Sequence, residues 1–250
     1  MESPPSLDTV DNRRLDQARE WLHRAASVVA LTGAGISAES GIPTFRGPGG
    51  LWRNFRPEQL ATPEAFDANP ELVWEWYDWR RRLIAQAQPN AGHLALAEFE
   101  HRQPNFALIT QNVDGLHDRA GSVNIVKLHG DIWIDRCLDC DAEEQTVPGD
   151  ARLSTHQCGC GGRLRPGVVW FGEPLPDRAW QTAAQAVRRA QVVLVIGTSA
   201  VVYPAAGLVP LAKEGGAKII EVNLEETPLS SGVDCSLRGK AGDILPQLLA

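Results

Sequence analysis

The chain contains 250 residues, of which 43% are hydrophobic and 22% are charged, and its net charge is −7. This composition excludes a disordered chain, and a globular chain of this length buries roughly 70 to 75% of its extended surface without needing a disulfide framework. The excess of acidic residues also argues against direct binding of nucleic acid, because that function depends on clustered lysine and arginine.

Short apolar runs alternate with amphipathic segments of helical length. Such runs are typical of buried parallel strands, which are apolar throughout. In chain order the sequence predicts a helix at 15–26, a strand at 27–31, helices at 72–87 and 93–102, a strand at 106–110, a helix at 177–190, a strand at 192–196, a helix at 203–214 and a strand at 218–222. The alternation predicts an α/β fold built on a Rossmann-like, doubly wound parallel sheet, which binds ligands beyond the carboxyl ends of its strands.

Two segments interrupt this alternation. Residues 51–103 are helical and rich in tryptophan, and residues 135–165 carry four of the five cysteines. We expect them to form a smaller, discontinuous domain. The larger, Rossmann-like domain then consists of 1–50, 104–134 and 166–250.

No targeting or membrane segment is evident. The N-terminal residues are neither basic nor apolar, and the longest aliphatic run, 192–196, is far shorter than the ~18 apolar residues of a membrane span. We therefore expect a cytoplasmic protein that does not contact a membrane.

A glycine-rich turn follows the first strand. The segment from Gly33 to Ala38 fits the pattern G-x-G-x-x-A, in which glycines allow a tight turn and let backbone N–H groups approach a pyrophosphate. The acidic residue that dehydrogenases carry about 20 residues later is missing, so a purely structural turn is an equal alternative for this motif alone.

The cysteines are arranged as two close pairs, Cys137 with Cys140 and Cys158 with Cys160. This spacing in a chain from a reducing compartment predicts a zinc ribbon. Four thiolates close the tetrahedron, so the ion is expected to be structural, and a zinc hydrolase mechanism is disfavoured. Cys235 stands alone and is expected to be a small core residue.

Polar residues are concentrated at 111–117, after the second strand, and at 127–130. Taken separately, these residues are compatible with turn chemistry and with a structural histidine at position 129. A doubly wound sheet, however, places its ligand where such strand ends meet.

At these motifs the chain resembles the sirtuins, the NAD-dependent protein-lysine deacylases. The matching segments occur in the family's order and are 33–37 with 41–47, 110–117, 128–130, 168–173, 197–199 and 222–223. The missing acidic residue agrees with the resemblance, because sirtuins bind NAD differently from dehydrogenases.

The resemblance implies a set of NAD-binding residues along the pyrophosphate, the nicotinamide pocket, the ribose and the adenosine. They are Gly33, Ala34, Gly35, Ser37, Phe45, Arg46, Gln111, Asn112, Val113, Asp114, Gly197, Thr198, Ser199, Asn223 and Ala241.

The resemblance also implies the reaction and its catalytic residues, His129 and Asn112. The amide oxygen of an acyl-lysine attacks C1′ of the nicotinamide ribose as nicotinamide leaves, and a general base then helps a ribose hydroxyl attack the resulting alkylimidate. A histidine suits this proton transfer near neutral pH. The implied products are nicotinamide, free lysine and 2′-O-acyl-ADP-ribose.

The implied protein substrate is an acylated lysine in an extended peptide. The segment 168–173, with Val169, Phe171, Gly172 and Glu173, resembles the strand that pairs with the peptide, and 201–203 faces it across the cleft. Backbone pairing of this kind gives affinity with little sequence readout. We expect the protein to act as a monomer.

Acyl specificity is indicated by the predicted helix at 72–87. Tyr77 and Arg80 are three residues apart and share one face, where a phenol and a guanidinium can bind one carboxylate. The alternative is a solvated charge run at 80–82. The pattern resembles the sirtuin class that removes succinyl and malonyl groups, in which a small residue matching Ala61 widens the acyl pocket. The stripe expected to face the core is Leu72, Trp76, Trp79 and Leu83.

Two other functions are alternatives. A protein ADP-ribosyltransferase would cleave the same nicotinamide bond but transfer ADP-ribose to a protein. A non-catalytic, NAD-responsive module that binds acyl-lysine is expected to lack His129 or Asn112, and both are present.

Overall fold

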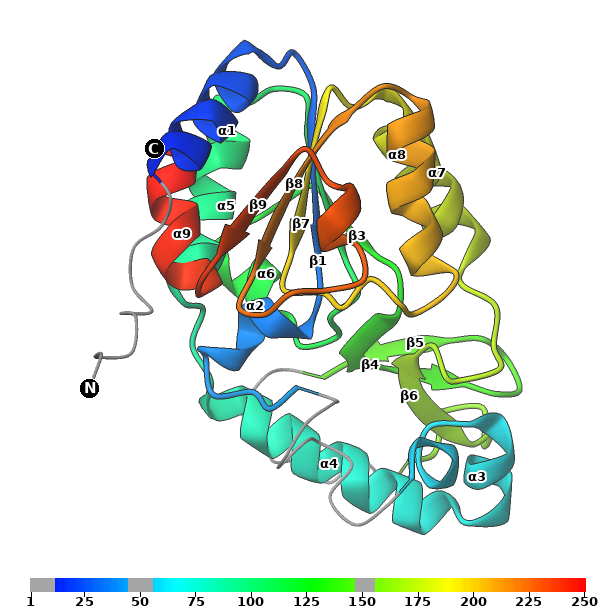
Figure 1. Ribbon diagram of the computed structural model, residues 1–250. Coiled ribbons are helices and arrows are strands. Elements are labelled where there is room, and N and C mark those ends of the chain that lie inside the picture. Colours follow the sequence, from blue (N-terminus) through cyan, green and yellow to red (C-terminus); the bar gives the residue numbers. More distant parts are fainter. Residues whose placement is uncertain (1–11, 45–55, 147–155) are drawn as a thin grey trace, which may run out of the picture.

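The computed structural model describes residues 12–44, 56–146 and 156–250. Its larger part is a six-stranded parallel sheet with the order β3-β2-β1-β7-β8-β9 (Figure 1). The strands are β1 (Val28–Thr32), β2 (Phe106–Thr110), β3 (Ile125–Lys127), β7 (Val192–Ile196), β8 (Lys218–Asn223) and β9 (Cys235–Arg238).

Helices cover both faces of this sheet, α1, α5 and α9 on one side and α7 and α8 on the other (Figure 1). Alternate side chains of a strand point to opposite faces, so Val28 and Ala30 join the core under the first group, whereas Val29 and Leu31 join the core under the second. The sheet is therefore buried on both faces. The helices are α1 (Asn12–Arg24), α5 (Ala91–Arg102), α7 (Asp177–Arg189), α8 (Leu208–Glu214) and α9 (Ala241–Leu248).

The strand order reverses at β1. The chain passes from β1 to β2 and β3 on one side and returns later to β7 on the other side. In doubly wound sheets the ligand crevice lies at such a reversal, beyond the carboxyl ends of the two strands. The short helices α2 (Ala34–Ala38) and α6 (Leu116–Ala120) follow β1 and β2 at this edge.

The smaller part contains an antiparallel sheet of order β5-β4-β6, with α3 and α4 beside it (Figure 1). A separate core, which includes the aromatic residues Phe66, Trp74 and Trp133, joins these elements. The elements are α3 (Pro63–Ala68), α4 (Pro70–Gln86), β4 (Gly130–Cys137), β5 (Glu143–Gln145) and β6 (Leu164–Val168).

Only Leu128 and His129 separate β3 of the large sheet from β4 of the small one. Gly130 begins β4 with φ +79°, and a Cβ atom there would lie 2.2 Å from the carbonyl oxygen of Gly167. A side chain at position 130 is therefore excluded, and glycine allows β4 to approach Gly167 of β6 closely, next to His129.

The α/β prediction is confirmed, and the four predicted strands agree with β1, β2, β7 and β8 to within one residue at each end. The predicted helix at 203–214 is a 3₁₀ turn, η2 (Ala205–Gly207), followed by α8. Leu96 of α5 belongs to the core of the large sheet, although α5 lies within the 51–103 segment predicted for the small domain. Two further 3₁₀ turns are η1 (Pro57–Gln59) and η3 (Ser230–Gly232).

Across the described parts of the chain, none of the helices combines the length and the apolar character needed to cross a bilayer.

Candidate active site

The turn after β1 meets the turn after β7 because two glycines allow the backbones to approach closely. Gly35 N–H donates to Gly197 O over 2.7 Å, and Gly33 N–H donates to Ile196 O over 3.0 Å. A Cβ atom at Gly35 would lie 2.7 Å from Gly197 Cα, and one at Gly33 would lie 2.7 Å from Thr198 Cβ. The glycines therefore make room for the contact between the turns, and these two N–H groups bond within the protein instead of facing a phosphate.

Polar side chains from the ends of β2, β7 and β8 converge on the same turns. Gln111 Nε2 donates to Thr198 Oγ1 over 3.0 Å, and Asn223 Nδ2 donates to Thr198 O over 2.9 Å. Asn112 Nδ2 donates to Gly33 O over 3.1 Å. Neutral amides and hydroxyls at a strand-order reversal fit NAD, whose ribose hydroxyls and carboxamide need hydrogen-bond partners.

The remaining predicted cofactor residues with described positions lie on the same edge of the sheet, close after the ends of their strands or at the start of α9. They are Ala34, Ser37, Val113, Asp114, Ser199 and Ala241. Phe45 and Arg46 lie outside the described residues.

A buried hydrogen-bond network surrounds Ser37. Asn90 N–H donates to His93 Nδ1 over 3.3 Å, which places the His93 proton on Nε2, 3.4 Å from Ser37 Oγ. Asn112 Nδ2 also donates to Ser37 Oγ over 3.2 Å, so the hydroxyl donates its own proton to Asp114 Oδ2 over 2.7 Å. Burial lowers the pKa of His93 to about 4, which keeps the ring neutral at pH 7. The direction of every bond in the network is thereby fixed.

His129 lies at the junction of the two sheets, with one ring nitrogen bound to the backbone. Its Nδ1 lies 3.0 Å from Gln111 O, and since a carbonyl oxygen only accepts, Nδ1 carries the proton. Nε2 is then the basic atom. Burial lowers the pKa of His129, although the bond to Gln111 acts in the opposite direction. The neutral, proton-accepting form is therefore the form present at pH 7.

The predicted pair on α4 does come together. Asn69 Oδ1 caps the helix by accepting from Leu72 N–H over 3.0 Å. The Arg80 guanidinium carbon lies 5.7 Å from the centre of the Tyr77 ring and 4.8 Å from that of Trp76. Only 1% of Tyr77 and 4% of Arg80 are exposed, so the solvated charge run is wrong for Arg80.

The expected core stripe of α4 does face the core of the smaller part. Trp76 is buried in it, and Leu72, Trp79 and Leu83 are partly buried and pack against it. Both sides of the helix carry large apolar residues, so its hydrophobic pattern does not define one face. The buried residues of α4 are Val73, Trp74, Trp76, Tyr77, Arg80, Arg81 and Ile84.

Burial of Arg80 has electrostatic consequences for its neighbours. Burial lowers the pKa of Arg80, while the nearby Tyr77 and Asp114 side chains favour its charged form. Burial likewise raises the pKa of Tyr77, and the charge of Arg80 acts against this. Arg80 thus connects the predicted acyl pocket on α4 with Asp114 at the predicted cofactor site.

The predicted peptide-binding segment continues from β6, which ends at Val168. Val169 N–H donates to His129 O and Phe171 N–H donates to Ala61 O, both over 2.9 Å. The segment therefore lies between His129, the predicted base, and Ala61, the predicted residue of the acyl pocket. Phe171 is 52% exposed, and Gly172 turns the chain with φ +87°.

Glu173 has a structural contact that the sequence does not predict. Both its carboxylate oxygens accept from the buried Arg165, and Oε2 also accepts from Trp170 N–H over 2.7 Å. The Glu173 carboxylate therefore links Arg165 of β6 to the backbone of the segment that follows it. Arg165 also donates to Val168 O over 2.9 Å.

The segment 201–203, predicted to face the peptide from the other side, has exposed side chains at both ends. Val201 is 38% exposed and Tyr203 is 76% exposed. They follow β7 and are available to a ligand from solvent.

The four cysteines form one cluster whose sulfur atoms all lie within 4.8 Å of one another. Cys137 Sγ lies 3.6 Å from Cys160 Sγ, and Cys140 Sγ lies 3.7 Å from Cys158 Sγ. These distances fit the edges of a tetrahedron of about 3.8 Å, which follow from Zn–S bonds of about 2.3 Å. Gly162 N–H donates to Cys160 Sγ over 3.4 Å, as expected for a zinc knuckle. The cluster therefore fits one structural zinc ion.

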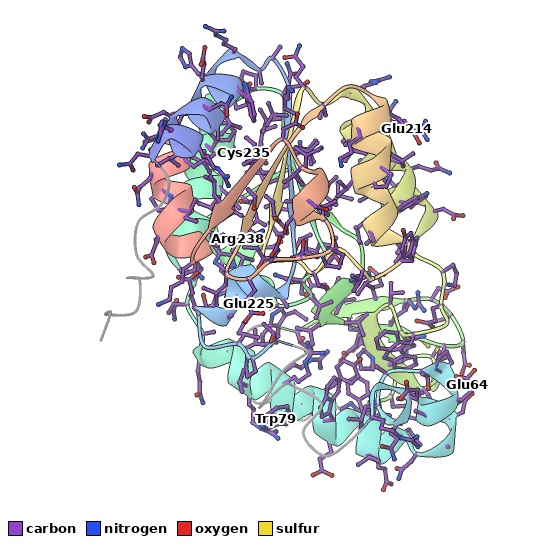
Figure 2. The ribbon with its side chains drawn as sticks, viewed as in Figure 1. Glu64, Trp79, Glu214, Glu225, Cys235 and Arg238 are labelled. Carbon is purple, nitrogen blue, oxygen red and sulfur yellow. The ribbon has the colours of Figure 1, made fainter. Side chains whose placement is uncertain are left out.

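Removal of zinc is expected to unfold the small sheet while the large sheet persists, because the ion joins the two cysteine pairs of the ribbon. Hydrogen exchange should show lost protection in β4 and β6 and retained protection in β1 and β7. Cys235 lies on β9 of the large sheet (Figure 2) and is not part of the cluster. Cys235→Ala should keep one zinc per chain, whereas Cys140→Ser should lose it. Full activity of a verified zinc-free sample would contradict the structural role.

Several residues of this site are not predicted from the sequence. His93 is one, although Asn90 and His93 together form a capping box at the start of α5. His117 Nε2 lies 3.0 Å from Thr32 Oγ1, and burial lowers the His117 pKa to about 3. Arg165 carries no local signal at all, since its partners are set by the fold.

Comparisons with known proteins agree with this geometry. A family model described as the Sir2 family matches residues 33–204. The chain is 59% identical over 216 residues to an NAD-dependent protein deacylase of Aquifex aeolicus, which covers 86% of this chain and 90% of that protein. It is 51% identical over 242 residues to an NAD-dependent protein deacylase of Thermococcus kodakarensis, which covers 94% of both.

Solved structures are similar over nearly the whole chain. A Sir2 homologue in complex with NAD has a TM-score of 0.84 and 47% identity, and the match covers 100% of this chain and 95% of that one. A Sir2 protein with a p53 peptide and NAD+ has a TM-score of 0.82 and 32% identity, over 94% of this chain and 97% of that one. The family match spans more than half of the chain, and the two deacylases are at least 51% identical over most of it. Together with the site described above, this shows that the chain belongs to the Sir2 family.

Proposed function

We propose that the protein is an NAD-dependent protein-lysine deacylase that prefers acyl groups ending in a carboxylate, succinyl and malonyl, and also removes acetyl groups. The enzyme class follows from membership of the Sir2 family. The acyl preference is supported by one observation, the buried and adjacent side chains of Tyr77 and Arg80. The expected products are nicotinamide, free lysine and 2′-O-acyl-ADP-ribose.

The cofactors have separate tasks. Bound NAD supplies the electrophilic ribose carbon that receives the acyl oxygen, and a zinc ion held by four cysteines stabilises the small sheet. The closed sulfur cluster has no open position for a substrate.

His129 is proposed to act as the general base. Its Nδ1 proton is held by Gln111 O, so Nε2 receives the proton of the ribose hydroxyl. The lowered pKa keeps this nitrogen unprotonated at neutral pH. The bond from Val169 N–H to His129 O ties the base to the segment proposed to bind the peptide.

Asn112 and Asp114 are proposed to shape the nicotinamide end of the site. Asn112 Nδ2 donates to both Gly33 O and Ser37 Oγ, so both of its hydrogens are engaged and ligand contacts fall to Oδ1. Asp114 is fixed by Ser37 Oγ and by Leu116 N–H, which donates over 2.9 Å. Such fixed groups need no reorganisation when a ligand binds.

Tyr77 and Arg80 are proposed to bind the distal carboxylate of the acyl group. A guanidinium offers charged donors, and a phenol adds a directional one. An acetyl group has no carboxylate to meet them. When an acetyl group is bound, the buried positive charge of Arg80 has no anionic ligand.

The test is a competition between matched peptides that differ only in one acyl-lysine. The protein is incubated with NAD and acetyl-, succinyl- or succinamyl-lysine peptides, and mass spectrometry follows peptide and acyl-ADP-ribose. Succinyl should be removed faster than succinamyl, which has the same length but a neutral amide. Equal rates would contradict the carboxylate pocket and leave the deacylase standing.

The same experiment separates the alternative reactions. Free lysine with acyl-ADP-ribose supports deacylation, whereas a protein that gains the mass of ADP-ribose indicates a transferase. Peptide binding without turnover indicates a binding module. The monomeric state, the cytoplasmic location, the absence of nucleic-acid binding and the domain boundaries stay predictions from the sequence.

A further inference from the structure

Tyr77 makes one hydrogen bond whose direction is fixed by chemistry. Trp170 Nε1 lies 2.9 Å from Tyr77 Oη, and both side chains are buried. An indole N–H only donates, so the phenol oxygen accepts this bond. The hydroxyl proton of Tyr77 must therefore point away from Trp170.

This direction matters for the choice of acyl group. A carboxylate accepts hydrogen bonds and does not donate, so it needs the Tyr77 hydroxyl as a donor. We propose that Trp170 is a specificity-determining positioning residue, which holds the Tyr77 hydroxyl as a donor toward the acyl carboxylate. The inference rests on the proposed function, because it assumes that Tyr77 and Arg80 bind that carboxylate.

Trp170 is itself held firmly from two sides. The Arg165 guanidinium carbon lies 3.5 Å from the centre of the indole ring, and Glu173 accepts the Trp170 backbone N–H over 2.7 Å. Arg165 and Glu173 form an ion pair in which each contacts the other through two atoms. The indole therefore has little freedom to leave Tyr77, and its N–H donor is fixed before the ligand arrives.

The burial of Tyr77 acts in the same sense. Desolvation raises the pKa of the phenol even though the charge of Arg80 and the bond from Trp170 lower it. The hydroxyl proton is therefore retained at neutral pH. A protonated phenol that already accepts from an indole is a donor to its next neighbour.

The test is Trp170→Phe, which keeps an aromatic ring and removes the N–H donor. The ratio of kcat/KM for succinyl-lysine to that for acetyl-lysine is expected to fall by about three- to tenfold, the usual effect of one hydrogen bond. The change should appear in KM for the succinyl peptide, and in its Kd by calorimetry, more than in kcat.

Trp74→Phe is the matched control. Trp74 lies on α4 in the same core, packs edge-on against Phe66 and stacks on His156. The substitution removes an indole but keeps the Trp170 donor to Tyr77, so it should leave the succinyl-to-acetyl ratio of kcat/KM unchanged. Tyr77→Phe completes a double-mutant cycle, in which Trp170→Phe should have no further effect on the ratio.

Two outcomes overturn the proposal while the carboxylate pocket stands. In the first, Trp170→Phe lowers kcat/KM for both peptides by the same factor. In the second, Trp170→Phe still lowers the ratio when residue 77 is phenylalanine. If Tyr77→Phe and Arg80→Met both leave the ratio unchanged, the carboxylate pocket itself fails, and the role of Trp170 fails with it.

Discussion

Replacing His129 with alanine is expected to lower kcat for deacylation by about 10² to 10⁴-fold, the usual contribution of a general base. The substitution removes Nε2, the proposed proton acceptor, but keeps the backbone carbonyl that Val169 N–H binds. The fold and NAD binding should therefore persist. The measurement is steady-state kinetics with NAD and an acylated peptide, together with a thermal melt of the variant.

The pH profile of the unmodified enzyme gives a second check on His129. Burial lowers its pKa below the ordinary 6.5, and the active form of a base is the unprotonated one. kcat/KM should therefore fall on the acid side with a midpoint below pH 6.5.

The control for the His129→Ala substitution is His101→Ala, which changes an exposed histidine of α5. More than a tenth of the activity remaining in a folded His129→Ala variant would contradict the assignment.

Replacing Arg80 with methionine is expected to reduce the preference for succinyl-lysine over acetyl-lysine by about two to four powers of ten. The basis is the cost of about 3 to 5 kcal/mol for removing one partner of a buried charge pair. Methionine fills a similar volume, so the core around Trp76 and Tyr77 should stay packed. The measurement is the ratio of kcat/KM values for the two peptides.

Arg82→Met is the matched control on the same helix, because Arg82 is exposed. It should leave the ratio and the acetyl rate unchanged. Burial raises the pKa of Asp114 and the charge of Arg80 acts against this, so KM for NAD is measured alongside. An unchanged ratio in Arg80→Met would mean that Arg80 serves Asp114 and the core rather than the acyl group.

The central strands of the large sheet are predictable because each is apolar over its whole length. β7 (Val192–Ile196) is buried at every position. The edge strands β3 and β9 are short and mix polar with apolar residues, so no run marks them. The cysteine cluster is predictable for a different reason, since metal geometry restricts ligand spacing.

The acyl pocket is less predictable, because its geometry depends on long-range contacts. Arg81 is buried because it donates to Ile132 O and pairs with Asp135, both on β4. Nothing near position 81 in the sequence distinguishes it from the exposed Arg82. The ion pair between Arg165 and Glu173 is equally unpredictable from the sequence, since it forms only when β6 and the following turn are in place.

The two proposed tasks of the site are carried by different stretches of the chain. Residues proposed to select the acyl group come from α4, from the turn after β6 and from Ala61 ahead of α3, whereas those proposed to hold NAD mostly follow the strands of the large sheet. Arg80 and Asp114 form the electrostatic link between them. Substrate range can therefore diverge among relatives through changes on α4, while the chemistry stays under constraint. For the same reason, α4 is the place to start when engineering this scaffold toward other acyl groups.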